Sequence, residues 1–183
     1  MKRFIAKSPW VYHLNTGSCN GCDIEIIAAL SPRYDAERVG VKLVGSPKLA
    51  DILLVTGPVT KQMTKRVKNI YEQVPSPKAV VCVGVCGSTS GIFEGAYNIE
   101  GGVDKVIPVD IYVTGCPPRP EAIILGVLKA AQKLATGNGT KTKPAAPSNN
   151  AGIGAKEGNP APELNKTAVH VSNKTQVVEN EKR

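Results

Sequence analysis

The chain has 183 residues, of which 42% are hydrophobic and only 4% are aromatic, so a core must be built mainly from Val, Ile, Leu and Ala. The formal net charge is +8, but Lys and Arg are spread along the chain without the basic clusters and stacking aromatics of nucleic-acid-binding proteins. No apolar run approaches the roughly 20 residues of a membrane span, and the basic start lacks the apolar region of a signal peptide. We therefore expect a cytosolic protein, or one held at a membrane by partners.

Strand-like and helix-like segments alternate over the first 136 residues. Residues 51–55 and 79–83 are apolar throughout, which is typical of parallel strands buried on both faces. The alternation predicts a three-layer α/β fold with a mainly parallel sheet in a domain of residues 1–136. The predicted strands are 11–14, 41–44, 51–55, 79–83 and 109–113, and the predicted helices are 23–30, 60–74 and 119–135.

The helix predicted over residues 60–74 has the clearest periodicity. Apolar residues recur at i, i+4, i+7, i+8 and i+11 from Met63, and Thr60 is a suitable N-cap. Lys61, Lys65 and Lys68 occupy the opposite face, for which solvent exposure is the simplest interpretation.

The composition changes near residue 137. From there to Arg183 the sequence is rich in Gly, Pro, Asn, Lys and Thr, and it contains no aromatic residue and no sustained periodicity. Such a segment cannot bury enough apolar surface to offset the entropy of ordering. The sequence therefore predicts a flexible, disordered C-terminal tail over residues 137–183.

Cysteines follow three of the five predicted strands. Because the number of cysteines is odd and no secretion signal is present, a disulfide framework is a poor interpretation. The carboxyl ends of parallel strands meet at one edge of a sheet, so these cysteines should lie close together. We call them the four loop cysteines: Cys19 and Cys22 after the first strand, Cys86 after the fourth and Cys116 after the fifth.

Four thiolates at one edge are the ligand set of an iron–sulfur cluster. The neighbouring glycines allow close backbone approach and leave N–H groups free to donate to sulfur. Structural zinc is an alternative, although zinc sites usually join two local cysteine pairs. A thioredoxin-like redox pair at Cys19 and Cys22 is another, but it leaves Cys86 and Cys116 unused. Cys82, inside an apolar strand, is better explained as a small buried hydrophobe.

Three segments combine into a recognisable pattern. They are residues 17–25 (Gly-Ser-Cys-Asn-Gly-Cys-Asp-Ile-Glu), residues 84–87 (Gly-Val-Cys-Gly) and residues 115–122 (Gly-Cys-Pro-Pro-Arg-Pro-Glu-Ala). Over about residues 8–135 the chain resembles the electron-transfer small subunit of membrane-bound, energy-converting group 4 [NiFe] hydrogenases. That subunit is related to the 20 kDa cluster-bearing subunit of respiratory complex I.

The resemblance implies a flavodoxin-like fold and one [4Fe-4S] cluster bound by the four loop cysteines, with Cys82 matching no ligand. It implies an electron relay that carries no catalytic metal and serves a [NiFe] hydrogenase-type large subunit. A ferredoxin-like iron–sulfur subunit would be a further partner, and membrane-arm subunits would be indirect partners. We accordingly expect a peripheral protein on the cytoplasmic side of the cell membrane.

The spacing of the first cysteine pair bears on the branch of the family. The complex I relatives carry two adjacent cysteines, whereas Asn20 and Gly21 separate Cys19 from Cys22 here. This difference favours a hydrogenase over a quinone reductase. A complex I-like quinone or sulfur reductase subunit remains an alternative, as does a zinc-stabilised scaffold module without a redox role.

A few further residues have two interpretations each. Asp23 and Glu25 are favourably placed near a helix N-terminus, and Glu25 could also assist proton movement or pairing at a partner interface. His13 is expected to be a core histidine with hydrogen-bond partners rather than a metal ligand. Residues 84–91 lack the Gly-x-Gly-x-x-Gly spacing and a Walker lysine, so no nucleotide site is expected.

Overall fold

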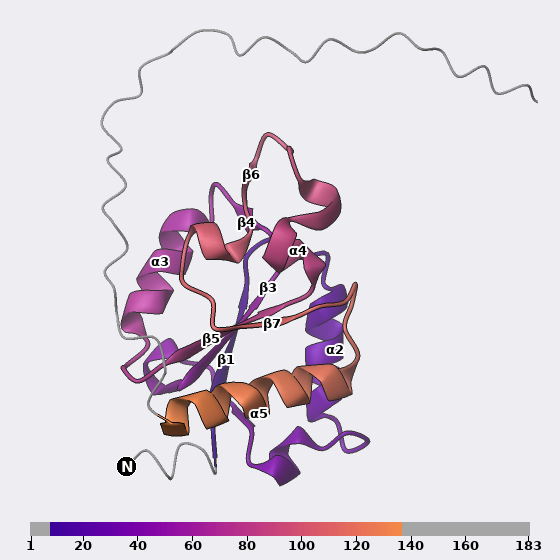
Figure 1. Cartoon of the computed structure of the whole chain (residues 1–183), viewed down its shortest axis with the longest axis vertical. Helices are drawn as coiled ribbons and strands as arrows, with labels where there is room; N and C mark the ends of the chain where they lie inside the picture. Colours follow the sequence, from indigo (N-terminus) through magenta and orange to yellow (C-terminus); the bar gives the residue numbers. More distant parts are fainter. Residues whose placement is uncertain (1–7, 137–183) are drawn as a thin grey trace, which may run out of the picture. The chain divides into compact units, whose positions relative to one another are not determined.

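The structure is a computed structural model that describes residues 8–136, and a five-stranded parallel sheet forms its centre (Figure 1). The strand order is β2-β1-β3-β5-β7, and every pairing in this sheet is parallel. Counting only these strands, the order is 2-1-3-4-5, which is the flavodoxin-like arrangement. The predicted fold class is therefore confirmed. The strands are β1 (Trp10–Asn15), β2 (Lys42–Leu43), β3 (Ile52–Thr56), β5 (Ala79–Val83) and β7 (Ile111–Val113).

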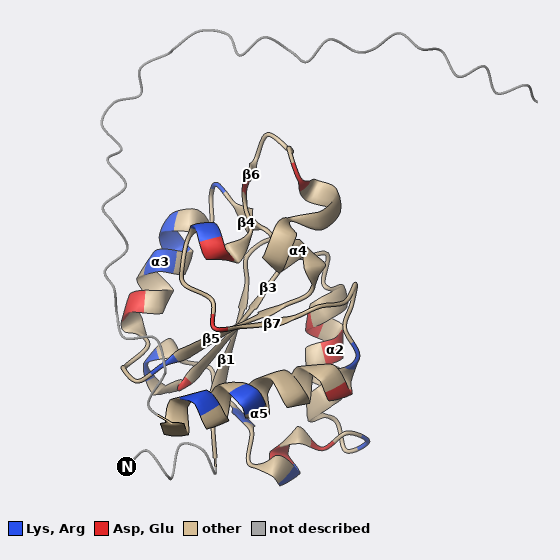
Figure 2. Cartoon of the chain, viewed as in Figure 1, with Lys and Arg blue, Asp and Glu red and all other residues tan. Residues whose placement is uncertain are grey.

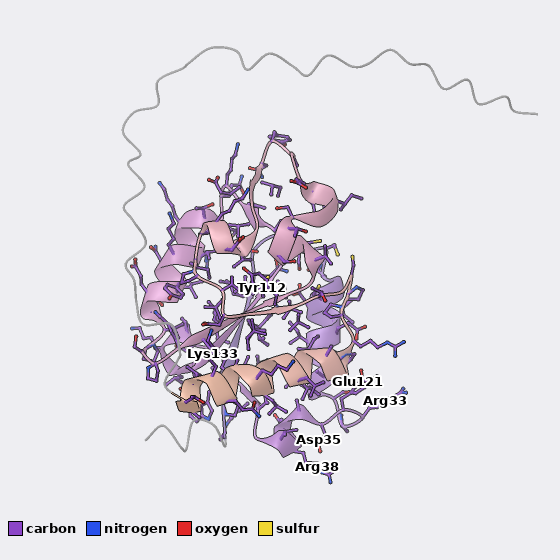
Figure 3. The ribbon with its side chains drawn as sticks, in the orientation of Figure 1. Arg33, Asp35, Arg38, Tyr112, Glu121 and Lys133 are labelled. Carbon is purple, nitrogen blue, oxygen red and sulfur yellow. The ribbon has the colours of Figure 1, made fainter. Side chains whose placement is uncertain are left out.

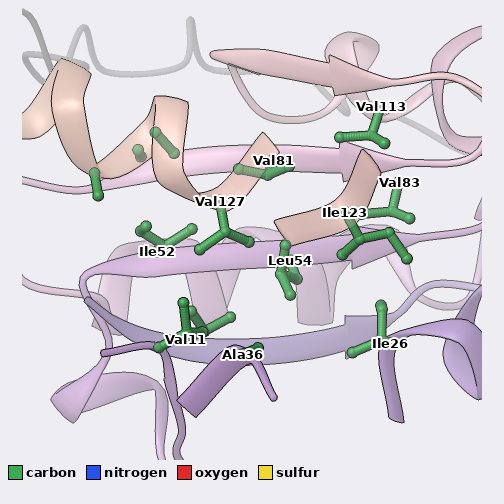
Figure 4. Packing of buried hydrophobic residues seen from close by; sticks show 14 of the residues in the cluster. Val11, Ile26, Ala36, Ile52, Leu54, Val81, Val83, Val113, Ile123 and Val127 are labelled. Atoms are coloured by element: carbon green, nitrogen blue, oxygen red, sulfur yellow. The ribbon is translucent and has the colours of Figure 1, made fainter. Parts of the chain in front are cut away.

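Helices cover both faces of the sheet. Helices α2 (Gly21–Leu30) and α5 (Pro120–Thr136) pack on one face, where Ile52 and Leu54 of β3 point (Figure 4). Helix α3 (Thr64–Gln73) packs on the other face, against Leu53 and Val55 of the same strand. Strand β3 is thus buried on both faces, which explains its continuous apolar sequence. The 3-10 helices are η1 (Ala36–Val39), η2 (Pro47–Leu49), η3 (Gly91–Phe93) and η4 (Val103–Lys105).

Three short elements are absent from the sequence prediction. Strands β4 (Val59–Thr60) and β6 (Ile99–Gly101) form a separate antiparallel pair, and helix α4 (Val85–Thr89) follows β5. Each has five residues or fewer, which is too short for a periodic pattern to be seen. The predicted helix start at Thr60 is wrong, because Thr60 pairs with Ile99 and α3 begins only at Thr64, although Thr60 Oγ1 accepts the N–H of Met63 at 3.4 Å.

Two predictions fall partly or wholly beyond the described part of the chain. The C-terminal tail predicted over residues 137–183 lies outside the described residues. The domain boundary after residue 136 stays a prediction for the same reason. Among residues 8–136, no helix is long and apolar enough to cross a membrane.

Lys78 is a buried cation that closes the end of α3. Its side chain is only 3% exposed, and its Nζ donates to the backbone oxygens of Tyr71 and Val74. The ammonium also lies 3.9 Å from the centre of the Tyr71 ring. Burial lowers the pKa of Lys78 below its usual value. These contacts satisfy carbonyl groups that a helix C-terminus leaves without partners.

We expect Lys78→Met to destabilise the folded chain by about 2 kcal/mol, because two buried carbonyls lose a charged donor. Urea unfolding of the full chain measures this loss. Lys129→Met changes an exposed lysine of α5 and should alter stability by less than about 0.5 kcal/mol. Equal stability of the two variants would contradict the role given to Lys78.

Candidate metal centre

The structure places the four loop cysteines at the carboxyl edge of the parallel sheet. Cys19 is exposed in the loop after β1, and Cys22 is buried in the first turn of α2. Cys86 is half-buried in α4, directly after β5, and Cys116 is exposed in the loop between β7 and α5. Figure 3 shows sulfur atoms gathered where α4, the start of α2 and the loop after β7 approach one another.

Glycines provide the room for these loops to meet. A Cβ atom on Gly84 would lie 2.6 Å from Cys22 Sγ and 3.6 Å from the carbonyl oxygen of Gly115. A Cβ atom on Gly21 would lie 3.6 Å from Cys19 Sγ and 4.0 Å from a side-chain atom of Pro117. The loops after β1, β5 and β7 are therefore in contact around the sulfur atoms.

The thiols also interact through charge. Burial raises the pKa of Cys22 to about 11, and the neighbouring Cys19, Cys86 and Cys116 contribute to that rise. Burial likewise raises the pKa of Cys86, followed by the charges of Cys116 and Cys19 and by a hydrogen bond with the Cys116 side chain. Cys22 and Cys86 therefore resist losing their protons in this environment, and their thiolate forms need a bound cation to balance the charge.

Within residues 8–136, no group of three or more His, Cys, Asp or Glu side chains has the arrangement that holds a single metal ion.

Two backbone hydrogen bonds connect the second and third cysteine loops. The N–H of Gly84 donates to the oxygen of Val113 at 2.8 Å, and the N–H of Val85 donates to the oxygen of Gly115 at 3.0 Å. These bonds continue the β5–β7 pairing beyond the ends of both strands. Because Cys86 follows Val85 and Cys116 follows Gly115, the bonds hold the two cysteines in fixed relative positions.

Asp23 holds the first cysteine loop in place. Its Oδ1 accepts from Thr56 Oγ1 at 2.6 Å and lies 2.8 Å from His13 Nε2. Its Oδ2 accepts from Asn15 Nδ2 at 2.6 Å and from Ser18 Oγ at 2.8 Å. Burial acts to raise the pKa of Asp23, but hydrogen bonds from Thr56 and Ser18 and the neighbouring His13 bring it below its usual value. The carboxylate therefore joins β1, β3 and α2 beside Cys22.

We expect Asp23→Ala to lower the free energy of unfolding by about 2–3 kcal/mol, because several partly buried donors lose a charged acceptor. Asp23→Asn keeps one acceptor oxygen and should lose less. Urea unfolding of both full-length variants measures the difference. An Asp23→Ala protein as stable as the parent would show that the network adds nothing to folding.

The structure also shows the positions of the other residues that the sequence analysis discussed. Cys82 is fully buried in the core under α4, as predicted, and burial raises its pKa to about 12. His13 is half-buried and hydrogen-bonded to Asp23 and Thr56, which agrees with its predicted structural role. Glu25 is half-buried, and its carboxylate has no ion pair within residues 8–136. Its role in proton movement or pairing stays a prediction.

The sequence interpretation missed the supports of the Cys19 loop. Asn15 Oδ1 accepts the backbone N–H groups of Gly17 and Ser18, which forms a local turn. A Cβ atom on Gly57 would lie 2.3 Å from the backbone nitrogen of Ser18, so only glycine fits there. The Asn15-Thr-Gly17 sequence is a turn signal that could have revealed the first support. The contact of Gly57 joins segments far apart in the chain and leaves no local signal.

Comparisons with known proteins give the family. Residues 19–130 match the family described as NADH ubiquinone oxidoreductase, 20 Kd subunit. The chain is 62% identical over 133 residues to the probable membrane-bound hydrogenase subunit mbhJ of Pyrococcus furiosus, and the match covers 73% of this chain and 80% of that protein. It is 44% identical over 129 residues to an NADH-quinone oxidoreductase subunit of Streptomyces griseus, with 70% of this chain and 54% of that protein covered.

A solved structure agrees with the sequence relatives. A chain of the membrane-bound sulfane sulfur reductase, an archaeal respiratory membrane complex, matches with a TM-score of 0.65 and 39% identity. The match covers 74% of this chain and 75% of that one. The family match spans the three loops that carry the candidate centre, from Cys19 to beyond Cys116. The chain therefore belongs to the family of the NADH ubiquinone oxidoreductase 20 Kd subunit, which includes subunits of membrane-bound hydrogenases.

Proposed function

We propose that the chain binds one [4Fe-4S] cluster through the four loop cysteines and relays electrons in a membrane-bound [NiFe] hydrogenase complex. The electrons would pass to a catalytic large subunit, where protons are reduced to hydrogen or hydrogen is oxidised. The observation that carries the proposal is the gathering of cysteines from three separate loops at one sheet edge, where a Cβ atom on Gly84 would lie next to both Cys22 Sγ and the Gly115 carbonyl oxygen. Such a donor set is the one that iron–sulfur clusters use.

The spacing of the cysteines favours a cluster over a single zinc ion. Structural zinc sites usually join two local cysteine pairs, whereas Cys86 and Cys116 are single residues in separate segments of the chain. Gly84 and Gly21 leave room beside two of the sulfur atoms, where a Cβ would come close to Cys22 Sγ or Cys19 Sγ.

The residues around the proposed cluster would orient it and control its exposure to water. When bound, the cluster would supply one-electron transfer at a potential set by its surroundings. Asp23 fixes the start of α2 and therefore orients Cys22. The buried position of Cys22 keeps water from the inner side, whereas Cys19 and Cys116 are exposed at the outer side. A partner subunit is needed to cover that outer side, which favours the catalytic large subunit as the neighbour there.

The degree of similarity favours a hydrogenase among the possible complexes. Identity is 62% to a membrane-bound hydrogenase subunit and 44% to a quinone oxidoreductase subunit. The two-residue spacing between Cys19 and Cys22 points the same way. The sulfane sulfur reductase match keeps a sulfur-reducing complex as the second candidate. In each case we infer a peripheral location on the cytoplasmic side, a ferredoxin-like subunit as electron source and indirect contact with membrane subunits.

Anaerobic purification of the full-length chain by itself tests the cluster, because other subunits of a complex would add iron of their own, and purification of the complex identifies its partners. We expect about four irons and four sulfides per chain, and a paramagnetic resonance signal on reduction by dithionite. A colourless chain with one zinc and no sulfide would overturn the cluster and support the scaffold alternative. The co-purifying large subunit decides the reaction: two Cys-x-x-Cys pairs support a nickel–iron centre, and their absence supports a sulfur or quinone reductase.

A further inference from the structure

Helix α3 carries its charges in the order that opposes its own dipole. Its first turn contains Lys65 and Arg66 and no acidic residue, and its last turn contains Glu72 and no basic residue. The N-terminus of a helix is its positive end, so cations there cost stability and acids at the other end do so as well. Figure 2 shows Lys and Arg on the part of α3 nearer to β4 and on the segment before it.

The cations of this region form no ion pair with any residue from 8 to 136. Lys61, Lys65 and Arg66 are exposed and Lys68 is half-buried. The two ion pairs found within residues 8–136 are His13–Asp23 and Lys133–Asp110, so none of these four cations takes part in one. Their positions at the positive end of the helix are therefore unfavourable, and no acidic side chain of residues 8–136 pairs with them.

The same surface includes an exposed aromatic residue. The backbone N–H of Lys61 donates to the oxygen of Asn98 at 2.9 Å, which places the residue before Asn98, Tyr97, beside the basic region. Tyr97 is 90% exposed. Arginine and tyrosine are enriched at protein interfaces whereas lysine is depleted there, so Arg66 and Tyr97 are the residues of this surface whose types favour an interface. We call Lys61, Lys65, Arg66, Lys68 and Tyr97 the basic edge.

The basic edge adjoins the first cysteine loop. Thr16 Oγ1 donates to the oxygen of Pro58 at 3.1 Å, and the N–H of Thr60 donates to the oxygen of Thr16 at 3.2 Å. A Cβ atom on Gly17 would lie 2.7 Å from Thr60 Cγ2. The segment that leads into Lys61 thus packs against the loop that leads into Cys19.

From these observations we propose that the basic edge is the docking surface for an acidic face of a protein redox partner in the same assembly. The inference rests on the proposed electron-transfer function, since it gives a reason for a docking surface beside the cysteines. Opposite charges steer such partners together and fix their orientation.

An acidic protein fits this surface better than an anionic bilayer does. A helix that lies on a membrane presents an apolar face to the lipid. The apolar face of α3, formed by Val67, Ile70 and Tyr71, is already buried against the sheet. The outer side of α3 is left with charged and polar groups, together with the exposed tyrosine nearby.

Two triple variants separate docking from net charge. The test variant is K61Q/K65Q/R66Q, and the control R33Q/R38Q/K129Q removes the same charge from positions elsewhere. Figure 3 shows Arg33 and Arg38 in the lower right part of the described domain, away from α3 on the left. The first measurement is binding of a fluorescein-labelled deca-glutamate peptide to the full-length chain at low ionic strength. We expect about tenfold weaker binding for the test variant and less than about twofold for the control. Equal losses would overturn the proposal.

Carbodiimide cross-linking in the purified complex then tests the native partner, because it joins lysine amines to carboxylates in direct contact. We expect Lys61 or Lys65 to link to acidic residues of another subunit, and Lys129 not to do so. Links only within this chain would overturn the proposal, as would binding of the basic edge to phosphatidylserine vesicles but not to the acidic peptide. Thermal unfolding adds a further measurement. The test variant should be at least as stable as the parent, because two cations are removed from the positive, N-terminal end of α3.

Measuring the iron and sulfide content of the chain shows whether the docking proposal or the cluster proposal has failed. Normal cluster content with no cross-links from the basic edge would refute docking alone. Cross-links from the basic edge in a complex whose chain holds no iron would refute the cluster alone.

Discussion

Cys86→Ser and Cys116→Ser should each lower the iron and sulfide content of the chain by at least about tenfold. Loss of a group that merely supports a metal ligand costs about 10–100-fold in metal affinity, so the loss of a direct ligand should cost no less. The remaining cysteine, Cys82, is fully buried in the core and is therefore not expected to replace a lost ligand. Electron transfer through the assembled complex should fall with the cluster content.

Cys82→Ser is the matched control for these substitutions. Cys82 is four residues before Cys86 and is fully buried in the core. Its serine variant should lose about 1–3 kcal/mol of stability, because a hydroxyl is buried among apolar side chains. It should nevertheless retain the iron, the sulfide and the resonance signal of the parent. A cluster lost in Cys82→Ser but kept in Cys116→Ser would show that the ligand assignment is wrong.

Much of this site follows from the sequence because parallel topology brings distant loops to one edge. The apolar runs at 51–55 and 79–83 fix the central strands, and each cysteine is then placed by the strand that it follows. Cys22 and Cys82 could also be separated from the sequence alone, since one opens a helix after a glycine and the other lies inside a strand. The structure buries both, and only Cys22 has the other loop cysteines as its main charged neighbours.

The contacts that hold the cysteine loops in place could not be predicted in the same way. The sequence predicts a helix N-terminal charge for Asp23, but its carboxylate accepts hydrogen bonds from Thr56 of β3 and Asn15 of β1 and so links two strands to a helix. Thr60 carries the signal of a helix cap and accepts the N–H of Met63, yet it pairs with Ile99 in a strand, and the helix begins only at Thr64. In both cases a contact with a residue more than 30 positions away decided the outcome, and no local pattern records such a contact.

The ends of the strands are also predicted only approximately from the sequence. The predicted strands at 41–44 and 109–113 are observed only as Lys42–Leu43 and Ile111–Val113. Both lie at edges of the sheet, where one neighbour instead of two fixes the backbone. Apolar composition predicts that such strands exist, but the number of paired residues depends on the partner strand.

Gly84→Ala should remove the cluster as effectively as the loss of a ligand, although glycine binds nothing through a side chain. Gly84 has a φ of +93°, which side chains rarely adopt, and its added Cβ would lie 2.6 Å from Cys22 Sγ. Since that distance is far below a van der Waals contact, either the sulfur atom or the Gly84 backbone must move. The backbone is held by its bond to Val113, so Cys22 is the group expected to shift.

Gly95→Ala separates backbone strain from contact with the sulfur. Gly95 also has a positive φ, +79°, but an added Cβ would meet nothing within 4 Å. We expect both variants to lose about 1–3 kcal/mol of stability through strain. Only Gly84→Ala should also lose iron and sulfide, by about tenfold or more, because positioning of a ligand within a fraction of an ångström decides occupancy. Equal iron content in the two purified variants would mean that the space beside Cys22 is not needed for the cluster, and that Gly84 serves only the turn after β5.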